Sequence, residues 1–281
     1  MDRYCVMGNP VEHSRSPWIH ARFAELTGET LDYGRRLAPL DGFAEAVAAF
    51  RAEAERDGHA ARGCNVTVPF KFQAAALARQ LTPRAALAGA ANVLSFRDDG
   101  IHGDNSDGIG LVADITRNAG VDLAARDILL LGAGGAGAGV LGPLIEAGAK
   151  RVVVANRTVP RAVELVRRHA ALALRHGVAL EAQAPDGLGG AFDVVVNATA
   201  SSLAGDAAPV AASALKPGAL AIDLMYGPAA AGFMAWAREH GAVPRDGLGM
   251  LVEQAAEAFD LWRGVRPPSA RVLAELRGQL V

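Results

Sequence analysis

The chain has 281 residues, of which 51% are hydrophobic and 21% are charged, a composition typical of a globular protein with room for two domains. With 28 Lys+Arg against 30 Asp+Glu, the formal net charge is −2, which argues against a nucleic acid or an anionic membrane as a partner held by bulk charge. Only two cysteines are present, Cys5 and Cys64, which excludes a disulfide scaffold and indicates reduced thiols in the cytoplasm.

The first third of the chain alternates short apolar strands with amphipathic helices. Strands are expected at residues 3–8, 31–38 and 65–68, and helices at 16–26, 41–55 and 70–81. Ser16 is placed to cap the first helix, and Pro17 to occupy its first turn. Residues 91–103 predict a hairpin that turns at Asp99–Gly100. The pattern is that of an α/β fold with a largely parallel sheet.

A second strand–helix series follows a helix at residues 105–120, which Ser106 or Asp107 would cap. Its strands are expected at 127–131, 151–155, 178–184, 193–200 and 219–226, and their near-continuous apolar runs fit parallel strands covered on both faces. Two helices, at 246–264 and 267–276, end the chain. The pattern divides the chain near residues 107 and 246 and leaves open where the last helices pack.

Gly132, Gly134 and Gly137 form a G-x-G-x-x-G motif directly after an apolar strand and at the start of a helix. Glycines let the backbone approach a pyrophosphate, and the helix N-terminus offers free amides and positive potential. The motif therefore predicts a doubly wound, Rossmann-type dinucleotide-binding domain. A tight glycine-rich turn without a ligand is the alternative.

The residues after the next strand favour NADP over NAD. NAD sites usually place an acidic residue there to accept from the ribose 2′-hydroxyl. This chain has Asn156 and Arg157 instead, with Arg161 four positions further on, and two guanidiniums can bind a 2′-phosphate bidentately. The alternative is that both arginines lie on a solvated helix face.

The segment "NVTVPFK", residues 65–71, places Lys71 in the first turn of a helix. That end of a helix disfavours a cation, so the lysine is expected to serve a site. In enzymes that reduce a ketone with hydride from a dinucleotide, a proton donor lies within hydrogen-bond reach of the ketone oxygen. The sequence contains neither metal-ligand spacing nor a G-x-S-x-G motif, so lysine is the leading candidate for that acid.

Several motifs, taken together and in order, resemble those of the shikimate dehydrogenase family. They cover almost the whole chain: "GNPVEHSRSPWIH", "NVTVPFK", "GAANVL", "GDNSDGIG", "GAGGAGAG", "NRT", "NAT", "DLMYGP" and "GLGMLVEQAAEAF". The resemblance implies reversible, NADPH-dependent reduction of 3-dehydroshikimate to shikimate. It also implies that the C-terminal helices return to the first domain, with the substrate in the interdomain cleft. A substrate domain of residues 1–107 and 247–281 and an NADP domain of residues 108–246 follow from it.

The resemblance also assigns expected roles residue by residue. It implies Lys71 and Asp107 as the catalytic pair, and Ser14, Ser16, Thr67, Asn92, Tyr226 and Gln254 as substrate-binding residues. It implies cofactor contacts by Gly132, Gly134, Gly135, Ala136, Gly137, Asn156, Arg157, Thr158, Arg161, Thr199 and Gly249, and no metal. This chain departs from the family at Ser106, where threonine is usual, and in "NATASSL", which lacks the usual glycine after the second serine.

Other functions and simpler structural roles stay open at this point. A quinate or dual quinate/shikimate dehydrogenase would share the fold and chemistry, and a non-catalytic NADP-binding module would share only the fold. Asn92 could merely start a hairpin, Asp107 could merely cap a helix, and Tyr226 could merely end a strand. Gln254 could be a surface residue. The N-terminus does not resemble a signal peptide, and no apolar run approaches the roughly 18 residues of a membrane span. Monomer and homodimer both fit.

Overall fold

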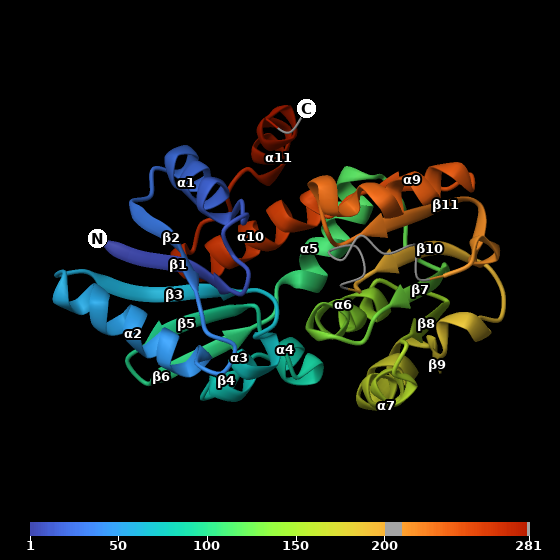
Figure 1. Ribbon diagram of the computed structural model, residues 1–281, viewed down its shortest axis with the longest axis horizontal. Coiled ribbons are helices and arrows are strands. Elements are labelled where there is room, and N and C mark those ends of the chain that lie inside the picture. The colour runs from blue at the N-terminus through green and yellow to red at the C-terminus, as the bar shows by residue number, and fades with distance from the viewer. Residues whose placement is uncertain (200–209, 280–281) are drawn as a thin grey trace. The chain divides into compact units, whose positions relative to one another are not determined.

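A computed structural model describes residues 1–199 and 210–279 of the chain. It contains two compact units, one formed by Met1–Gly110 with Leu251–Gln279 and the other by Leu111–Met250. The chain passes from one unit to the other within helices α5 (Asp107–Ala113) and α10 (Leu248–Arg263). Each unit is built of helices and one six-stranded sheet (Figure 1), so the α/β class is confirmed.

The sheet of the first unit is mixed. Its strands in spatial order are β2 (Leu31–Leu37), β1 (Asp2–Gly8), β3 (Ala60–Val66), β5 (Val93–Arg97), β6 (Gly100–Asp104) and β4 (Gln80–Leu81). Three neighbouring pairs are parallel, whereas β3–β5 and β5–β6 are antiparallel. The predicted hairpin is present as β5–β6, but Asp98 and Asp99 form its turn and Gly100 already belongs to β6.

Helices cover both faces of this sheet. They are α1 (Ser16–Thr27), α2 (Phe43–Arg56), α3 (Lys71–Leu77), α4 (Pro83–Ala88), the end of α10, and α11 (Ser269–Gly278). One core joins Met7 and Leu94 of the sheet to Phe50 of α2. Another contains Tyr4 and Tyr33, with Trp262 of α10 packed against it.

The C-terminal helices belong to the first unit. Arg22 of α1 donates two hydrogen bonds, of 2.6 and 2.8 Å, to Glu275 of α11. This confirms the expected return of the chain to the N-terminal unit (Figure 1).

Two boundaries near "NVTVPFK" differ from the prediction. Strand β3 ends at Val66, because Thr67 and Val68 already form the turn in which Phe70 N donates to Thr67 O at 3.0 Å. Helix α3 ends at Leu77 and β4 follows, so the predicted helix to residue 81 is too long. The two-residue β4 has no periodicity by which a sequence could reveal it.

The sheet of the second unit is entirely parallel. Its spatial order is β12 (Val243–Arg245), β11 (Leu215–Asp223), β10 (Phe192–Asn197), β7 (Asp127–Leu131), β8 (Arg151–Ala155) and β9 (Ala179–Gln183). Counting strands from β7, this is the 3-2-1-4-5-6 order of a Rossmann fold. The Rossmann prediction is confirmed, although the sequence pattern does not foresee the three-residue β12.

Among the described residues of this unit, besides the parts of α5 and α10, the helices are α6 (Gly135–Glu146), α7 (Val159–His176) and α9 (Ala231–Glu239). Shorter helical turns are the π-helical η1 (Asp114–Asn118) and the 3-10 turns η2 (Pro185–Gly187), η3 (Ala212–Ala214) and η4 (Gly227–Ala230). Leu129, Val153, Val195 and Ala221, one from each of four neighbouring strands, share a buried core. This rigid sheet positions the loops at its carboxyl edge.

Cys5 and Cys64 lie opposite each other on β1 and β3, both buried and both free thiols. Burial, together with the neighbouring Cys64 thiol, raises the pKa of Cys5 well above its ordinary value. Both cysteines therefore behave as small apolar core residues. Among the helices of the described residues, none combines the length and apolarity that crossing a membrane would require.

Candidate active site

Lys71 and Asp107 form an ion pair in the first unit. Lys71 is the first residue of α3, and its Nζ donates to Asp107 Oδ2, at the start of α5, over 2.5 Å. The side chains are 15% and 6% exposed. The Lys71 ammonium is placed unfavourably at a helix N-terminus. The shielded Asp107 carboxylate gives it an anionic partner, which water would not supply.

Asn92 links this pair to helix α10 in the C-terminal part of the chain. Its Nδ2 lies 2.8 Å from Asp107 Oδ1 and 3.2 Å from Gln254 Oε1 of α10. Ser106 closes the network, because its backbone N donates to Asn92 Oδ1 at 2.8 Å and its hydroxyl lies 3.0 Å from Asn92 Nδ2. Asn92, Ser106 and Gln254 are buried, so Gln254 is not the surface residue that the alternative assumed.

Backbone hydrogen bonds hold these segments in register. Ala91 N donates to Lys71 O at 2.9 Å, and Asn92 N donates to Asp104 O at 3.0 Å. Val66 N donates to Asn92 O at 2.8 Å. The segments that carry Lys71, Asn92 and Asp107 are therefore fixed to one another independently of their side chains.

Ser14 and Ser16 lie together at the start of α1. Ser14 Oγ donates to Ser16 Oγ at 3.1 Å, and Ser16 N donates to Ser14 Oγ at 3.3 Å. Ser16 is the first helical residue and Arg15 occupies the N-cap without a side-chain cap. The prediction that Ser16 caps the helix is therefore wrong, because Ser14 is the serine that accepts from a helix amide.

Thr67 lies beside the "GNP" turn that follows β1. Its backbone N donates to Met7 O at 2.9 Å, and a Cβ on Gly8 would lie only 2.2 Å from Thr67 Cγ2. Gly8 therefore has to be glycine for the threonine to occupy this place. Thr67 is half-buried, which leaves part of the side chain accessible.

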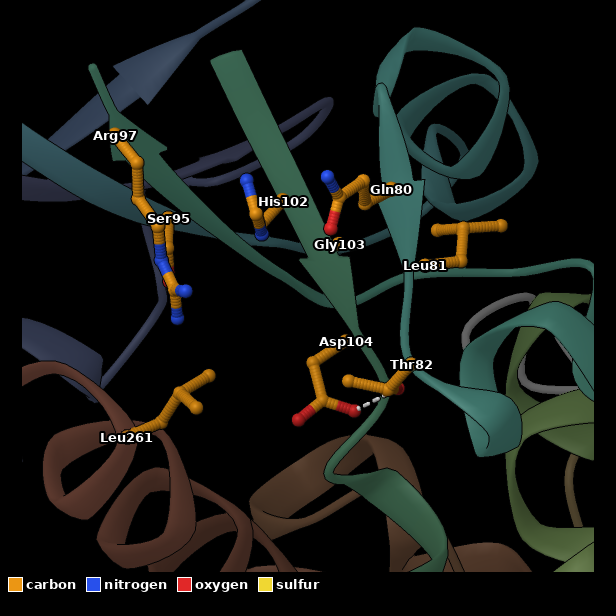
Figure 2. Close-up of a pocket in the computed structure, with 9 residues that line it drawn as sticks. All are labelled: Gln80, Leu81, Thr82, Ser95, Arg97, His102, Gly103, Asp104 and Leu261. Carbon is orange, nitrogen blue, oxygen red and sulfur yellow. Dashed lines mark hydrogen bonds between the residues drawn. The ribbon is translucent and has the colours of Figure 1, made fainter. Parts of the chain in front are cut away.

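A cavity of about 170 Å³ lies along β4, β5 and β6 of the same unit (Figure 2). Asp104 contributes to its lining and accepts from Thr82 Oγ1 at 2.6 Å and from Arg84 at 2.7 Å. Burial opposes ionisation of Asp104, but the Arg84 and Thr82 hydrogen bonds lower its pKa overall. The cavity contains none of the expected site residues, and Asp104 stabilises the strand end that leads to Asp107.

The glycine-rich loop of the second unit has space on one side and close contacts on the other. Gly132 has a φ of 103°, which favours glycine, and a Cβ on Gly137 would lie 2.1 Å from Gly132 O. A Cβ on Gly134, in contrast, would meet nothing within 4 Å. Gly134 directly precedes α6, so the open position lies where a phosphate would approach the helix N-terminus. The fit to a dinucleotide is good.

Asn156 ties the end of β8 to this loop. Its Oδ1 accepts from Ala133 N at 3.1 Å, and its Nδ2 donates to Thr158 O at 2.9 Å. Arg157 and Arg161 are exposed, and neither forms an ion pair with any described residue. These two guanidiniums are therefore available to an anion.

Three further expected residues lie in the second unit. Thr199 Oγ1 donates to Asn197 Oδ1 at 2.7 Å, and Tyr226 directly precedes η4. A Cβ on Gly249 would lie 1.7 Å from Asp114 Oδ1, so close packing already requires glycine there. The remaining "ASSL" of the "NATASSL" segment lies outside the described residues.

The structure thus gathers Lys71, Asn92, Asp107 and Gln254 into one network and places Ser14 beside Ser16. Glycine loop residues 132–137 adjoin Asn156. Sequence reasoning missed the part that Ser106 plays in this network. Its position before Asp107 in "GDNSDG" is the available signal, but the sequence presents it only as a candidate helix cap and as a departure from the family's threonine. In the described parts of the chain, no group of three or more His, Cys, Asp or Glu residues could hold a metal.

Strand order and loop geometry together place the second unit in the dinucleotide-binding class. Residues 6–94 match the shikimate dehydrogenase substrate binding domain, 114–224 the shikimate / quinate 5-dehydrogenase family, and 247–277 the shikimate 5'-dehydrogenase C-terminal domain. The chain belongs to the shikimate dehydrogenase family, which confirms the resemblance read from its motifs.

Relatives match this chain over nearly their full lengths. A shikimate dehydrogenase (NADP(+)) of Methylibium petroleiphilum is 66% identical over 98% of this chain and 94% of its own. One of Paracidovorax citrulli is 65% identical over 99% and 98%. Among solved structures, shikimate 5-dehydrogenase from Thermus thermophilus in complex with NADP(H) and shikimate is 31% identical, with a TM-score of 0.82 over the whole of both chains. An Ael1 enzyme from Pseudomonas putida is 45% identical, with a TM-score of 0.86 over 98% of both.

Proposed function

We propose that this protein reversibly reduces 3-dehydroshikimate to shikimate with NADPH, and that Lys71 and Asp107 handle the proton. The observation that carries the proposal is the shielded 2.5 Å contact between Lys71 Nζ and Asp107 Oδ2, held from the other side by Asn92. It occurs in a member of a family whose relatives are named as NADP-dependent shikimate dehydrogenases.

Lys71 is the acid in the direction of reduction. It donates a proton from Nζ to the oxygen that was the ketone oxygen, and in shikimate oxidation it takes that proton back. Asp107 holds the ammonium in place and keeps it charged before the transfer. Because Asn92 and the backbone bonds fix both residues, little rotamer freedom has to be lost when the substrate binds.

The substrate is held around this pair. Ser14 and Ser16 bind its carboxylate, and Thr67, Asn92 and Gln254 bind its ring hydroxyls, with Tyr226 beside it. Asn92 and Gln254 already share a hydrogen bond with each other, which fixes their amides relative to the proton donor. A buried polar network that is fully satisfied in this way orients its members well.

NADPH supplies the hydride when it is bound. The backbone of residues 132–137 would hold its pyrophosphate, and Asn156, Arg157, Thr158 and Arg161 would hold the adenosine 2′-phosphate. Thr199, which follows β10, and Gly249, the second residue of α10, are the remaining residues that we assign to the cofactor. The open space at Gly134 and the unpaired guanidiniums support this assignment.

A quinate dehydrogenase is not favoured, because the two relatives from Methylibium and Paracidovorax are named for shikimate and NADP(+) and no acidic residue follows Asn156. A binding module without catalysis would have no use for a shielded lysine–aspartate pair. The free thiols of Cys5 and Cys64 fit a reducing compartment, so we place the enzyme in the cytoplasm. Both a monomer and a homodimer fit the proposed function.

One assay tests the function directly. Purified protein is mixed with shikimate or quinate and with NADP⁺ or NAD⁺, and the absorbance of reduced nicotinamide is followed. We expect the highest kcat/KM for shikimate with NADP⁺. Higher kcat/KM for quinate, or no turnover with any of the four combinations, would contradict the proposal.

A further inference from the structure

Arg35 of β2 forms hydrogen bonds to the backbone of the loop that carries Ser14 and Ser16. Its Nε and Nη2 donate to Ser14 O at 2.9 and 2.6 Å. Two donors on a single carbonyl fix the guanidinium plane against the loop, as the fork of arginine allows and an ammonium does not. Arg35 is exposed and lies two positions after buried Tyr33, so both side chains leave the same face of β2. Strand β2 therefore positions Arg35 at the start of α1.

The charge of Arg35 is not neutralised within the described residues. It forms no ion pair there, and its Nη1 makes no hydrogen bond. The next residue, Arg36, lies on the opposite face of β2 and pairs with Glu53. Lys71 is likewise neutralised, by Asp107. Among these three cations, Arg35 alone offers its charge to an incoming anion.

We propose that Arg35 is a positioning residue that sets the Ser14–Ser16 loop and draws the carboxylate of the substrate to it. The inference rests on the proposed function, in which the substrate is a carbon ring that carries one carboxylate and otherwise only neutral hydroxyl or keto oxygens. Hydroxyls bind a carboxylate as neutral donors, whereas a nearby guanidinium adds charge assistance. Arg35 thereby determines which end of the substrate faces the serines and which faces Lys71.

The experiment compares Arg35→Gln with the wild type on two substrates, shikimate and its neutral methyl ester. Glutamine still donates to Ser14 O but carries no charge. With shikimate, kcat/KM should fall by about fivefold, through KM, as expected for a partly exposed charge. With the ester, the wild type and the variant should have equal kcat/KM, and KM for NADP⁺ should stay unchanged with both substrates.

Arg36→Gln is the matched control, because it removes the same charge from the adjacent position on the other face of β2. It should leave kcat/KM for shikimate as in the wild type. Arg35→Lys keeps the charge without the fork, so it should recover part of the loss. Added salt should lower kcat/KM for shikimate in the wild type and in Arg35→Lys, and less so in Arg35→Gln.

Each outcome decides between distinct readings. If Arg35→Gln lowers kcat/KM equally for shikimate and for the ester, Arg35 is only structural and the inference is overturned. An equal loss in Arg36→Gln would attribute the effect to general charge and overturn it too. If Arg35→Gln does not fold, the wild type is compared on the two substrates instead: added salt should lower kcat/KM for shikimate and not for the ester, and an equal effect on both overturns the inference. A wild type without shikimate activity would instead overturn the proposed function itself.

Discussion

The proposed substrate side, in the first unit, consists of side chains that already bind one another, whereas the proposed cofactor side, in the second unit, consists of backbone and unpaired cations. On the first side, Lys71, Asp107 and Asn92 are shielded and mutually hydrogen-bonded. On the second, Gly134 has open space and Arg157 is exposed.

This difference has a physical reason. Proton transfer needs donor and acceptor at hydrogen-bond distance and within about 0.5 Å of the productive geometry, so a network orients these groups in advance. A phosphate is a large, diffuse anion that amides and guanidiniums can bind from several directions. Substitutions on the substrate side should therefore act on turnover, and those on the cofactor side on affinity.

The largest expected effect is that of Lys71→Met. Methionine keeps length and apolar packing but removes the charge and the proton, so kcat should fall by about 10²- to 10⁴-fold, the usual contribution of positioned proton transfer. KM values should change much less. Lys71→Arg should fail as well, because guanidinium does not release its proton near neutral pH. Steady-state kinetics of both variants, with direct NADP⁺ binding to show folding, make the measurement.

Lys216→Met is a matched control for this experiment. Lys216 of the second unit also pairs with carboxylates, those of Asp127 and Asp193, at 2.8 Å. Its loss should leave kcat unchanged. If folded Lys71→Met retained more than about a tenth of wild-type turnover, the loss would be smaller than the usual contribution of a general acid. Lys71 would then be a binding residue, and the acid would lie elsewhere.

On the cofactor side, Arg157→Ala should act on affinity alone. A lost charge-assisted hydrogen bond costs about 1.5–3 kcal/mol, so KM for NADP⁺ should rise roughly tenfold or more. KM for NAD⁺, which has no 2′-phosphate, should stay almost the same. The comparison of both cofactors in one preparation is its own control, and equal effects on the two would contradict the NADP assignment.

Two substitutions in the glycine motif should affect different quantities: Gly137→Ala the stability of the fold, and Gly134→Ala the affinity for NADP⁺. Gly137→Ala places a Cβ 2.1 Å from Gly132 O, and overpacking of this kind typically costs about 1–3 kcal/mol of stability. Gly134→Ala meets no protein atom, so it should unfold like the wild type yet bind NADP⁺ more weakly. Thermal unfolding and calorimetric binding of both variants test this. Wild-type NADP⁺ affinity in Gly134→Ala would show that the pyrophosphate lies elsewhere.

His20 should make the first unit sensitive to acid. It is fully buried, stacks on Tyr33 with ring centroids 4.2 Å apart, and neither ring nitrogen has a partner among the described residues. Burial of the ring lowers its pKa from 6.5 to about 3. Between these two pKa values the unfolded chain binds a proton that the folded chain does not bind. The contribution of His20 to stability is therefore complete above pH 6.5 and is lost as the pH falls towards 3.

At pH 5 this loss amounts to about 2 kcal/mol. His20→Phe fills the same space without a titrating group, so its free energy of unfolding should change less between pH 7 and pH 5, by about that amount. Denaturant unfolding at both pH values gives the comparison, with exposed His13→Gln as the control. An unchanged pH dependence in His20→Phe would exclude His20 as the cause.

Local patterns in the sequence predict much of the fold, but contacts between distant residues escape them. Alternating strands and helices, and Gly132, Gly134 and Gly137 after an apolar strand, indicate a Rossmann unit that the strand order confirms. The short strands β4 and β12 carry no periodicity and cannot be predicted in this way. Residue contacts such as those of Asn92 with Gln254, and of Arg35 with Ser14, join positions whose separation no local rule covers. For the site, the family resemblance supplies the candidates, and their roles stay predictions.

The smallest expected effect distinguishes the two serines of the substrate side. Because Ser16 N donates to Ser14 Oγ at 3.3 Å, Ser14 acts as the acceptor at the start of α1. Ser14→Ala should therefore cost stability, by about 1 kcal/mol as for a lost helix cap, and Ser16→Ala should cost less. Both variants should raise KM for shikimate more than they lower kcat, because a bound carboxylate is contacted equally in the ground and transition states. Thr27→Val, which removes a hydroxyl at the other end of α1, should leave KM as it is. If the two serine variants changed only thermal stability, the pair would serve the helix and the carboxylate would bind elsewhere.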